Sequence, residues 1–138
     1  IAHLKDVKGL IRLDYGVLLG TLIYVAGYST VSLLWRRRYW RRLARGVVGG
    51  SILTLAFMLA LGLGTLFGFD QLFLQFHLLS FANDFWQLDP SRDYLIMLFP
   101  GGFWYDATLF CVLAITGMAV VLGGVSGGLL AKFKASLD

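Results

Sequence analysis

Two histidines are the residues of this chain best suited to acid–base chemistry. His77 lies in a segment rich in phenylalanine, and His3 lies near the start of the chain. Imidazole is the side chain that gains and loses a proton near neutral pH, so either residue is a candidate general base. A histidine that makes one structural hydrogen bond is the competing interpretation, and the local sequence pattern by itself favours it for His77.

Carboxylates flank His77 at helical spacing. Asp70 and Asp84 lie seven residues to either side of it, and Ser80 lies three residues beyond it. Seven residues make nearly two turns of an α-helix, so side chains at this spacing share one face. If the helix ends before Asp84, only Asp70 and Ser80 share the face of His77. The expected walls of the pocket are Phe73, Phe76 and Phe81.

Two other kinds of chemistry fit the residue types but not their spacing. A zinc site would use His3, His77 and one or two aspartates, and a serine nucleophile would be Ser80 or Ser91. The sequence contains no HExxH motif, and neither serine lies in a GxSxG motif. We therefore predict no metal and no other cofactor.

The elements that must position these residues are membrane helices. The chain has 138 residues, of which 58% are hydrophobic, and its mean hydropathy is +0.75. Apolar runs long enough to span a bilayer occur at 15–35, 46–69 and 107–132. The sequence predicts one all-α membrane domain with three transmembrane helices, and the start without Met leaves room for a fourth helix upstream.

Charge patterning predicts how this bundle lies in the membrane. The connection 36–45 is strongly basic, and Lys132 ends the last apolar run while Lys134 lies in the short tail 133–138. Positive residues in short connections mark the cytoplasmic side. The segment 1–14 and the loop 70–106, which carry the two histidines, are then expected together on the outer side. The six arginines of the basic connection are Arg36, Arg37, Arg38, Arg41, Arg42 and Arg45.

The run RRRYWRR within this connection has two interpretations. Basic residues that alternate with aromatic ones can grip the phosphates of a nucleic acid. Beside a membrane span they more often hold the helix against anionic lipid. We favour the lipid interpretation and predict no nucleic-acid partner.

The segments outside the spans also show helical patterns. Segment 1–14 has an apolar side and predicts a short helix in the outer interface. In the loop, the helix is expected to continue to Phe81, turns follow around Asp89 and Pro90, and 94–99 forms a short helix that Pro100 ends. The apolar side of the first segment consists of Leu4, Val7, Leu10 and Ile11.

Glycines at four-residue spacing predict close packing between helices. Small residues at this spacing let two helix backbones approach one another. A compact bundle is therefore expected rather than three independent anchors. The pairs are Gly16/Gly20, Gly64/Gly68, Gly123/Gly127 and Gly124/Gly128.

The loop sequence FHLLSFANDFWQLDPSRDYLIMLFPGGFWYDA, together with the opening HLKDVKGL, resembles the bacterial lipoprotein intramolecular transacylase family. The shared pattern is an HL-x-DV element, a basic connection, an FH pair and the block F-x-ND-x-W-x-LDP-x-x-D-x-LI-x-x-FP-x-x-FW. The resemblance covers nearly the whole chain. The family has a further N-terminal membrane helix, which this sequence does not include.

The resemblance implies an activity. Members of the family act on lipoproteins whose N-terminal cysteine carries a diacylglyceryl group, and they move the sn-2 acyl chain to the α-amine. The product is a lyso-form lipoprotein. The implied location is the bacterial plasma membrane, and the implied partners are membrane lipid and a diacylated lipoprotein. The alternative interpretation is a non-catalytic small subunit of a larger membrane complex.

The resemblance also implies roles for the two histidines. His77 falls on the FH position and is the leading candidate for the base. His3 falls on the HL position and is a candidate second base, proton shuttle or oxyanion donor. Asp6 is a candidate to orient His3, although a simple pair on a helix surface would also explain its position.

Further residues of the loop block match the family pattern. Asn83 is expected to orient a reacting group, and Asp84 or Asp93 to orient a histidine. Asp89 is a candidate substrate-binding residue, although its position before Pro90 also suits a turn. The aromatic candidates for the acyl-chain region are Trp86, Phe81 and Phe103, and packing at the membrane interface explains them equally well.

Overall fold

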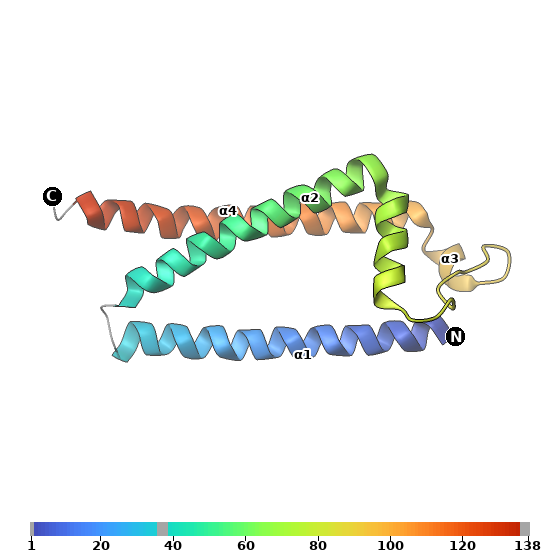
Figure 1. Ribbon diagram of the computed structural model, residues 1–138, viewed down its shortest axis with the longest axis horizontal. Coiled ribbons are helices and arrows are strands. Elements are labelled where there is room, and N and C mark those ends of the chain that lie inside the picture. The colour runs from blue at the N-terminus through green and yellow to red at the C-terminus, as the bar shows by residue number, and fades with distance from the viewer. Residues whose placement is uncertain (1, 36–38, 136–138) are drawn as a thin grey trace.

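The computed structural model describes residues 2–35 and 39–135, and most of them are helical (Figure 1). No strand occurs within these two ranges. The prediction of an all-α fold is therefore confirmed. The elements are α1 (Ala2–Thr30), the π-helical turn η1 (Val31–Trp35), α2 (Trp40–Ser80), α3 (Tyr94–Leu98) and α4 (Gly101–Ala135).

Three of these helices are long and apolar enough to cross a membrane, as predicted. The shortest of them, α1, has 29 residues and is about 44 Å long at the usual helical rise. The hydrocarbon core of a bilayer is only about 30 Å thick. The helices therefore extend beyond the apolar runs and carry their polar residues into the two interfaces.

The expectation of a separate surface helix at 1–14 is wrong. The first helix runs without interruption from Ala2 to Thr30 and is straight in Figure 1. No proline breaks it, and Gly16 inside a helix costs only about 1 kcal/mol. The first turns of α1 are therefore the end of the spanning helix itself.

The first expected connection is shorter than predicted. Because α2 begins at Trp40, Arg41, Arg42 and Arg45 lie on its first turns rather than in a loop. The loop 70–106 contains the predicted helical segments, since α2 continues to Ser80 and α3 covers Tyr94–Leu98, but α4 begins at Gly101, earlier than the predicted span. Residues 36–38 of the basic connection and 136–138 of the tail lie outside the described residues.

The second helix changes direction at Gly68, where φ is −162° and ψ is 46°. Glycine has a low helix propensity, so interrupting a helix costs less there. One turn earlier, the Thr65 hydroxyl donates a hydrogen bond to the Leu61 carbonyl at 2.8 Å, a contact that often bends helices. After the bend, residues 69–80 cross from α4 to α1 (Figure 1). We call residues 69–80 the crossing limb.

The first part of α2 packs antiparallel against α4 (Figure 1). Its buried side chains are seven residues apart, and the buried pair on α4 has the same spacing, which is typical of coiled-coil packing. Small residues bring the backbones close, since a Cβ at Gly123 would lie 2.8 Å from the Ser51 Cβ. The buried residues are Ala44, Ser51, Met58 and Thr65 on α2, and Val112 and Ala119 on α4.

The glycine prediction is confirmed only in part. Gly123 and Gly127 face α2. Gly64 instead meets Leu72 across the bend, and Gly68 is the bend itself. A Cβ at any of the remaining glycines of the four pairs would meet nothing within 4 Å in the described structure; these are Gly16, Gly20, Gly124 and Gly128.

The bundle therefore has two chemically different ends. The arginine end consists of η1, the start of α2 and the end of α4. The histidine end consists of the start of α1, the crossing limb, residues 81–100 and the start of α4. The first helix meets α2 through η1 at the arginine end and through His3 at the histidine end, where Asp6 also bonds to the turn after α2.

The packing of α2 on α4 predicts unequal effects at two adjacent glycines. Gly123→Ala should destabilise the protein by about 1–3 kcal/mol, because the new methyl group meets Ser51. Gly124→Ala is the matched control, since its Cβ meets nothing within 4 Å. Thermal unfolding of both variants in detergent measures the difference, and equal midpoints would contradict the packing described.

Candidate active site

One face of the crossing limb carries an aromatic stripe that joins α4 to α1. Its members are four residues apart and therefore neighbours on the helix surface. At one end, the Phe69 ring lies 5.4 Å from the Tyr105 ring of α4. At the other end, the Phe81 ring lies 5.0 Å from the His3 ring of α1. The stripe consists of Phe69, Phe73 and His77 on the limb, and of Phe81, which follows directly after the limb ends at Ser80.

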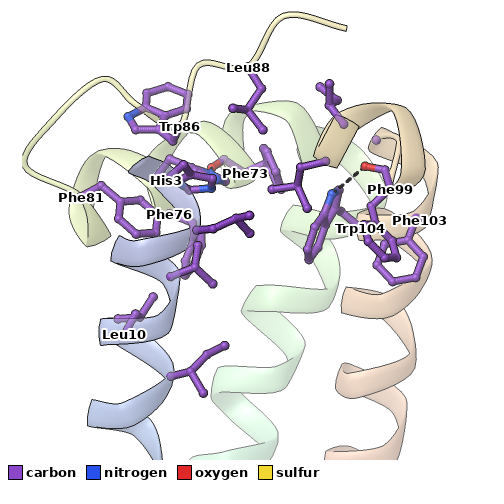
Figure 2. Close-up of a pocket in the computed structure, with 17 residues that line it drawn as sticks. His3, Leu10, Phe73, Phe76, Phe81, Trp86, Leu88, Phe99, Phe103 and Trp104 are labelled. Atoms are coloured by element: carbon purple, nitrogen blue, oxygen red, sulfur yellow. Dashed lines mark hydrogen bonds between the residues drawn. The ribbon is translucent and has the colours of Figure 1, made fainter. Parts of the chain in front are cut away.

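A cavity of about 610 Å³ lies at the histidine end. Its walls come from the start of α1, the crossing limb, the turn after it, α3 and the start of α4. Figure 2 shows Phe81 and Trp86 on one side of the cavity and Phe103 and Trp104 on the other. The lining is almost wholly apolar, and the two imidazoles are its only titratable groups in the described structure. The volume is typical of a ligand site.

The structure brings the two histidines together, as the topology predicted. Their ring centroids are 5.9 Å apart, although the residues are far apart in the sequence. His3 is 8% exposed and His77 is 6% exposed. Two acid–base groups therefore share one wall of an apolar cavity.

The ring of His77 is fixed in one orientation. Its Nδ1 lies 2.7 Å from the carbonyl oxygen of Phe73. Because a carbonyl oxygen only accepts hydrogen bonds, Nδ1 must carry the proton, and Nε2 of the neutral ring keeps its lone pair. Four aromatic rings lie within 4.3–5.6 Å of the His77 ring centroid: Phe73, Phe76, Phe81 and Trp86. His77 therefore has the tautomer that a general base requires.

His3 has an unpaired nitrogen. Its Nδ1 is buried and has no hydrogen-bond partner in the described structure. The electrostatic neighbours of the ring are His77 and the carboxylate of Asp6. A buried polar atom without a partner is costly, so His3 keeps an unsatisfied hydrogen-bonding group in a residue that lines the cavity.

Asp6 and Asn83 connect α1 to the turn after the crossing limb. The Asn83 amide donates a hydrogen bond to Asp6 Oδ2 at 3.0 Å, and its oxygen accepts one from the Phe85 amide at 3.0 Å. No hydrogen bond joins Asp6 to either imidazole in the part of the chain that is described. In this structure, Asp6 and Asn83 hold the wall of the cavity in place.

The expectation that Asp84 or Asp93 orients a histidine is wrong for the described structure. Asp84 is exposed and accepts a hydrogen bond from the Gln87 side chain at 3.3 Å. Asp93 accepts a hydrogen bond from the Asp89 amide at 2.8 Å. Both carboxylates stabilise turns, because the helix ends at Ser80 and the chain leaves the face that carries His77.

Asp89 is a turn residue and does not line the cavity. Its Oδ1 accepts hydrogen bonds from the Ser91 hydroxyl at 2.7 Å and the Ser91 amide at 2.8 Å. Both bonds lower the pKa of the Asp89 carboxyl, and the bond from the Ser91 hydroxyl has the larger effect. The Ser91 hydroxyl is engaged in this turn, and Asp70 is exposed beyond the bend.

The aromatic candidates lie in the cavity wall, whereas the carboxylate candidates do not. Trp86, Phe81 and Phe103 all line the cavity. Sequence reasoning missed the contribution of α1, whose Val7, Leu10 and Ile11 also line it. The sequence signal for this wall is the apolar side of segment 1–14, a pattern that also suits a helix at the membrane interface. Trp104 was missed as well, and its indole donates to the Phe99 carbonyl at 3.0 Å.

Comparison with known proteins identifies the family of the chain. The family model described as lipoprotein intramolecular transacylase Lit matches residues 1–104. The chain belongs to this family. The region matched by the transacylase family includes every residue that lines the cavity.

An uncharacterized protein of Aquifex aeolicus (strain VF5) is 29% identical over 139 residues. The alignment covers 99% of this chain and 59% of the relative, so the chain spans about three fifths of that protein's length. No solved structure matches the chain.

The link between α1 and the turn predicts coupled effects in this transacylase-family chain. Asp6→Ala and Asn83→Ala should each cost about 1–2 kcal/mol, because each removes one partner of a part-buried hydrogen bond. The double variant should cost less than the sum of the two. Unfolding in detergent measures the cycle, and Asp84→Ala is the control because its contact is local and exposed. Strict additivity would contradict the link.

Proposed function

We propose that the chain catalyses an intramolecular acyl transfer on bacterial lipoproteins. The sn-2 acyl chain of the diacylglyceryl group on the N-terminal cysteine moves to the α-amine of the same cysteine and gives a lyso-form lipoprotein. The observation that carries the proposal is the pair of buried imidazoles, 5.9 Å apart, on the wall of an apolar cavity. The family match supports the reaction class.

The cavity suits the chemistry of this substrate. The diacylglyceryl group brings apolar chains, for which the lining offers aromatic and aliphatic side chains. The attacking amine and the ester belong to one molecule, so bringing them together supplies a large part of the rate. The reaction therefore needs no covalent nucleophile from the protein. It needs a base, because an α-amine with a pKa of roughly 7.7–8.0 is partly protonated at neutral pH.

We assign the base to His77. Its Nε2 takes a proton from the amine while the amine nitrogen attacks the ester carbonyl carbon. A C–N bond forms, the bond from the carbonyl carbon to the glyceryl oxygen breaks, and His77 returns the proton to that oxygen as a hydroxyl. Atoms and charges balance without water or a second substrate. The Phe73 carbonyl on Nδ1 supports this role, because it keeps Nε2 free of its proton in the neutral ring.

We assign to His3 the stabilisation of the tetrahedral intermediate. The negative charge that develops on the ester oxygen requires a hydrogen-bond donor. The buried and unpaired Nδ1 of His3 supports this role. In the alternative role of proton shuttle, the same Nδ1 of His3 would accept and release the proton. Trp86, Phe81 and Phe103 are the proposed contacts for an acyl chain.

We further propose that the histidine end lies at the outer face of the bacterial plasma membrane. Positive residues at the arginine end support this orientation. Lipoproteins with a free α-amine and a diacylglyceryl group would then reach the cavity from the outer leaflet.

The direct test follows acyl transfer in the full natural protein. The purified protein is reconstituted in lipid with a synthetic diacylated lipopeptide, and mass spectrometry measures the N-acylated product. His77→Ala should lower the rate at least about 100-fold, the usual contribution of a general base. Gln75→Ala is the matched control, because Gln75 is exposed on the same crossing limb.

Each negative result removes a different part of the proposal. An unchanged rate in folded His77→Ala would remove His77 as the base. No product from folded wild-type protein would remove the activity and favour the alternative of a non-catalytic subunit, which would co-purify with a larger complex.

An isotope experiment tests the intramolecular route. Two lipopeptides of different peptide mass are mixed, and only one carries a ¹³C-labelled sn-2 acyl chain. Because the amine and the ester react within one molecule, the label should appear on the amine of the labelled lipopeptide alone. Label on the other peptide would show exchange between molecules and contradict the proposed route.

A further inference from the structure

The charges of this protein are separated between the two ends of the bundle. In the described structure, the arginine end carries five cations and no carboxylate. All seven described carboxylates lie in the half nearer the histidine end, where they are mixed with four cations. We call the five cations of the arginine end the basic collar. It consists of Arg41, Arg42 and Arg45 on α2, and Lys132 and Lys134 on α4.

The basic collar is formed by two helices that contact each other at this end. The Trp40 ring of α2 lies 5.1 Å from the Phe133 ring of α4. The cations of the collar, all within five residues of this contact on their own helix, therefore lie around a shared aromatic centre. Figure 1 shows the start of α2 and the end of α4 at the same end of the molecule.

Aromatic rings hold two of the guanidinium groups. The Arg41 guanidinium carbon lies 5.6 Å from the centroid of the Trp40 ring. The Arg42 guanidinium carbon lies 4.9 Å from the centroid of the Tyr39 ring. Cation–π contacts at these distances restrain the side chains, and the donor N–H groups at the edges of each guanidinium plane can still reach an oxygen ligand.

The described structure offers no negative charge to balance the collar. No carboxylate of the described residues forms an ion pair with any of its members; the ion pair found is Arg92 with Asp89, at the other end. The positive dipole of α2 at its start adds to the charge of the arginines rather than balancing it. An anionic partner would balance this charge, which no carboxylate of residues 2–35 and 39–135 does.

The position of the collar identifies the chemistry of that partner. It follows directly on the apolar faces of two membrane-spanning helices, and its aromatic residues are those that favour the membrane–water boundary. The anions available at this depth are lipid phosphates. A guanidinium matches two phosphate oxygens with parallel hydrogen bonds.

We propose that the basic collar is a binding surface for anionic phospholipid headgroups of the leaflet at the arginine end. Phosphatidylglycerol, which carries a net negative charge, should bind there in preference to zwitterionic phosphatidylcholine. This site lies at the opposite end of the bundle from the cavity, and the proposal is independent of acyl transfer.

Competition between two lipids tests the proposal. The full protein in detergent is mixed with equal amounts of phosphatidylglycerol and phosphatidylcholine that have the same acyl chains, and native mass spectrometry measures which lipid stays bound. The wild-type protein should retain more phosphatidylglycerol. Arg41→Gln, Arg42→Gln and Arg45→Gln, combined, should reduce this preference by about fivefold for each charge removed, and added salt should reduce it as well.

The histidine end supplies a matched control. Lys5→Gln, Lys8→Gln and Arg12→Gln, combined, remove the same charge from exposed positions of α1 and should leave the preference unchanged. Replacing the three arginines of α2 by lysine should retain most of it. Circular dichroism confirms that each variant keeps its helices.

Three results would overturn the proposal. One is equal retention of the two lipids by the wild-type protein. Another is an equal loss of preference in the control at the histidine end, which would show a general charge effect. The third is binding of nucleic acid through the collar arginines without a preference between the lipids.

Discussion

The bend of α2 at Gly68 is the constraint on which the site depends. A straight α2 would carry His77 about 13 Å further along the helix axis, away from α1. With the bend, the crossing limb joins α4 to α1, and its aromatic stripe becomes one wall of the cavity. Thr65 and the contact of Leu72 with Gly64 support the bend from both sides. The backbone at one glycine thus decides whether two distant imidazoles meet.

The apolar surroundings of the cavity strengthen the electrostatic interactions of the two histidines. Away from water, a hydrogen bond such as that from His77 to the Phe73 carbonyl is electrostatically stronger, and an unpaired atom such as His3 Nδ1 is more costly. The first effect fixes the tautomer of His77, and the second leaves His3 with an unsatisfied hydrogen-bonding group. In the proposed reaction, the substrate provides both the nucleophile and the ester. The protein then contributes a base, a donor and a dry cavity that holds the two reacting groups together.

Sequence could predict the spans and the convergence of the histidines, but not the partners of individual side chains. Hydropathy predicts which segments cross the bilayer, and two predicted spans separate His3 from His77, so both residues had to lie at one end. The arginines of 36–45 predict only which side of the membrane that end faces. The carboxylates were a different case. Asp84, Asp89 and Asp93 lie among aromatic residues whether they serve a site or a turn, and only the three-dimensional structure shows the hydrogen bonds that they make in turns. An apolar stripe such as that of α1 likewise looks the same against lipid and against a cavity.

An experimental structure with a bound substrate analogue tests the central claim most directly. A diacylglyceryl-cysteine peptide with ether-linked chains has no acyl group to transfer, so it would remain in the site. The account predicts its α-amine within hydrogen-bond distance of His77 Nε2 and one chain in the cavity between α1, the crossing limb and α4. An analogue bound at the arginine end or on the lipid-facing surface, with the two imidazoles buried behind packed side chains, would contradict it.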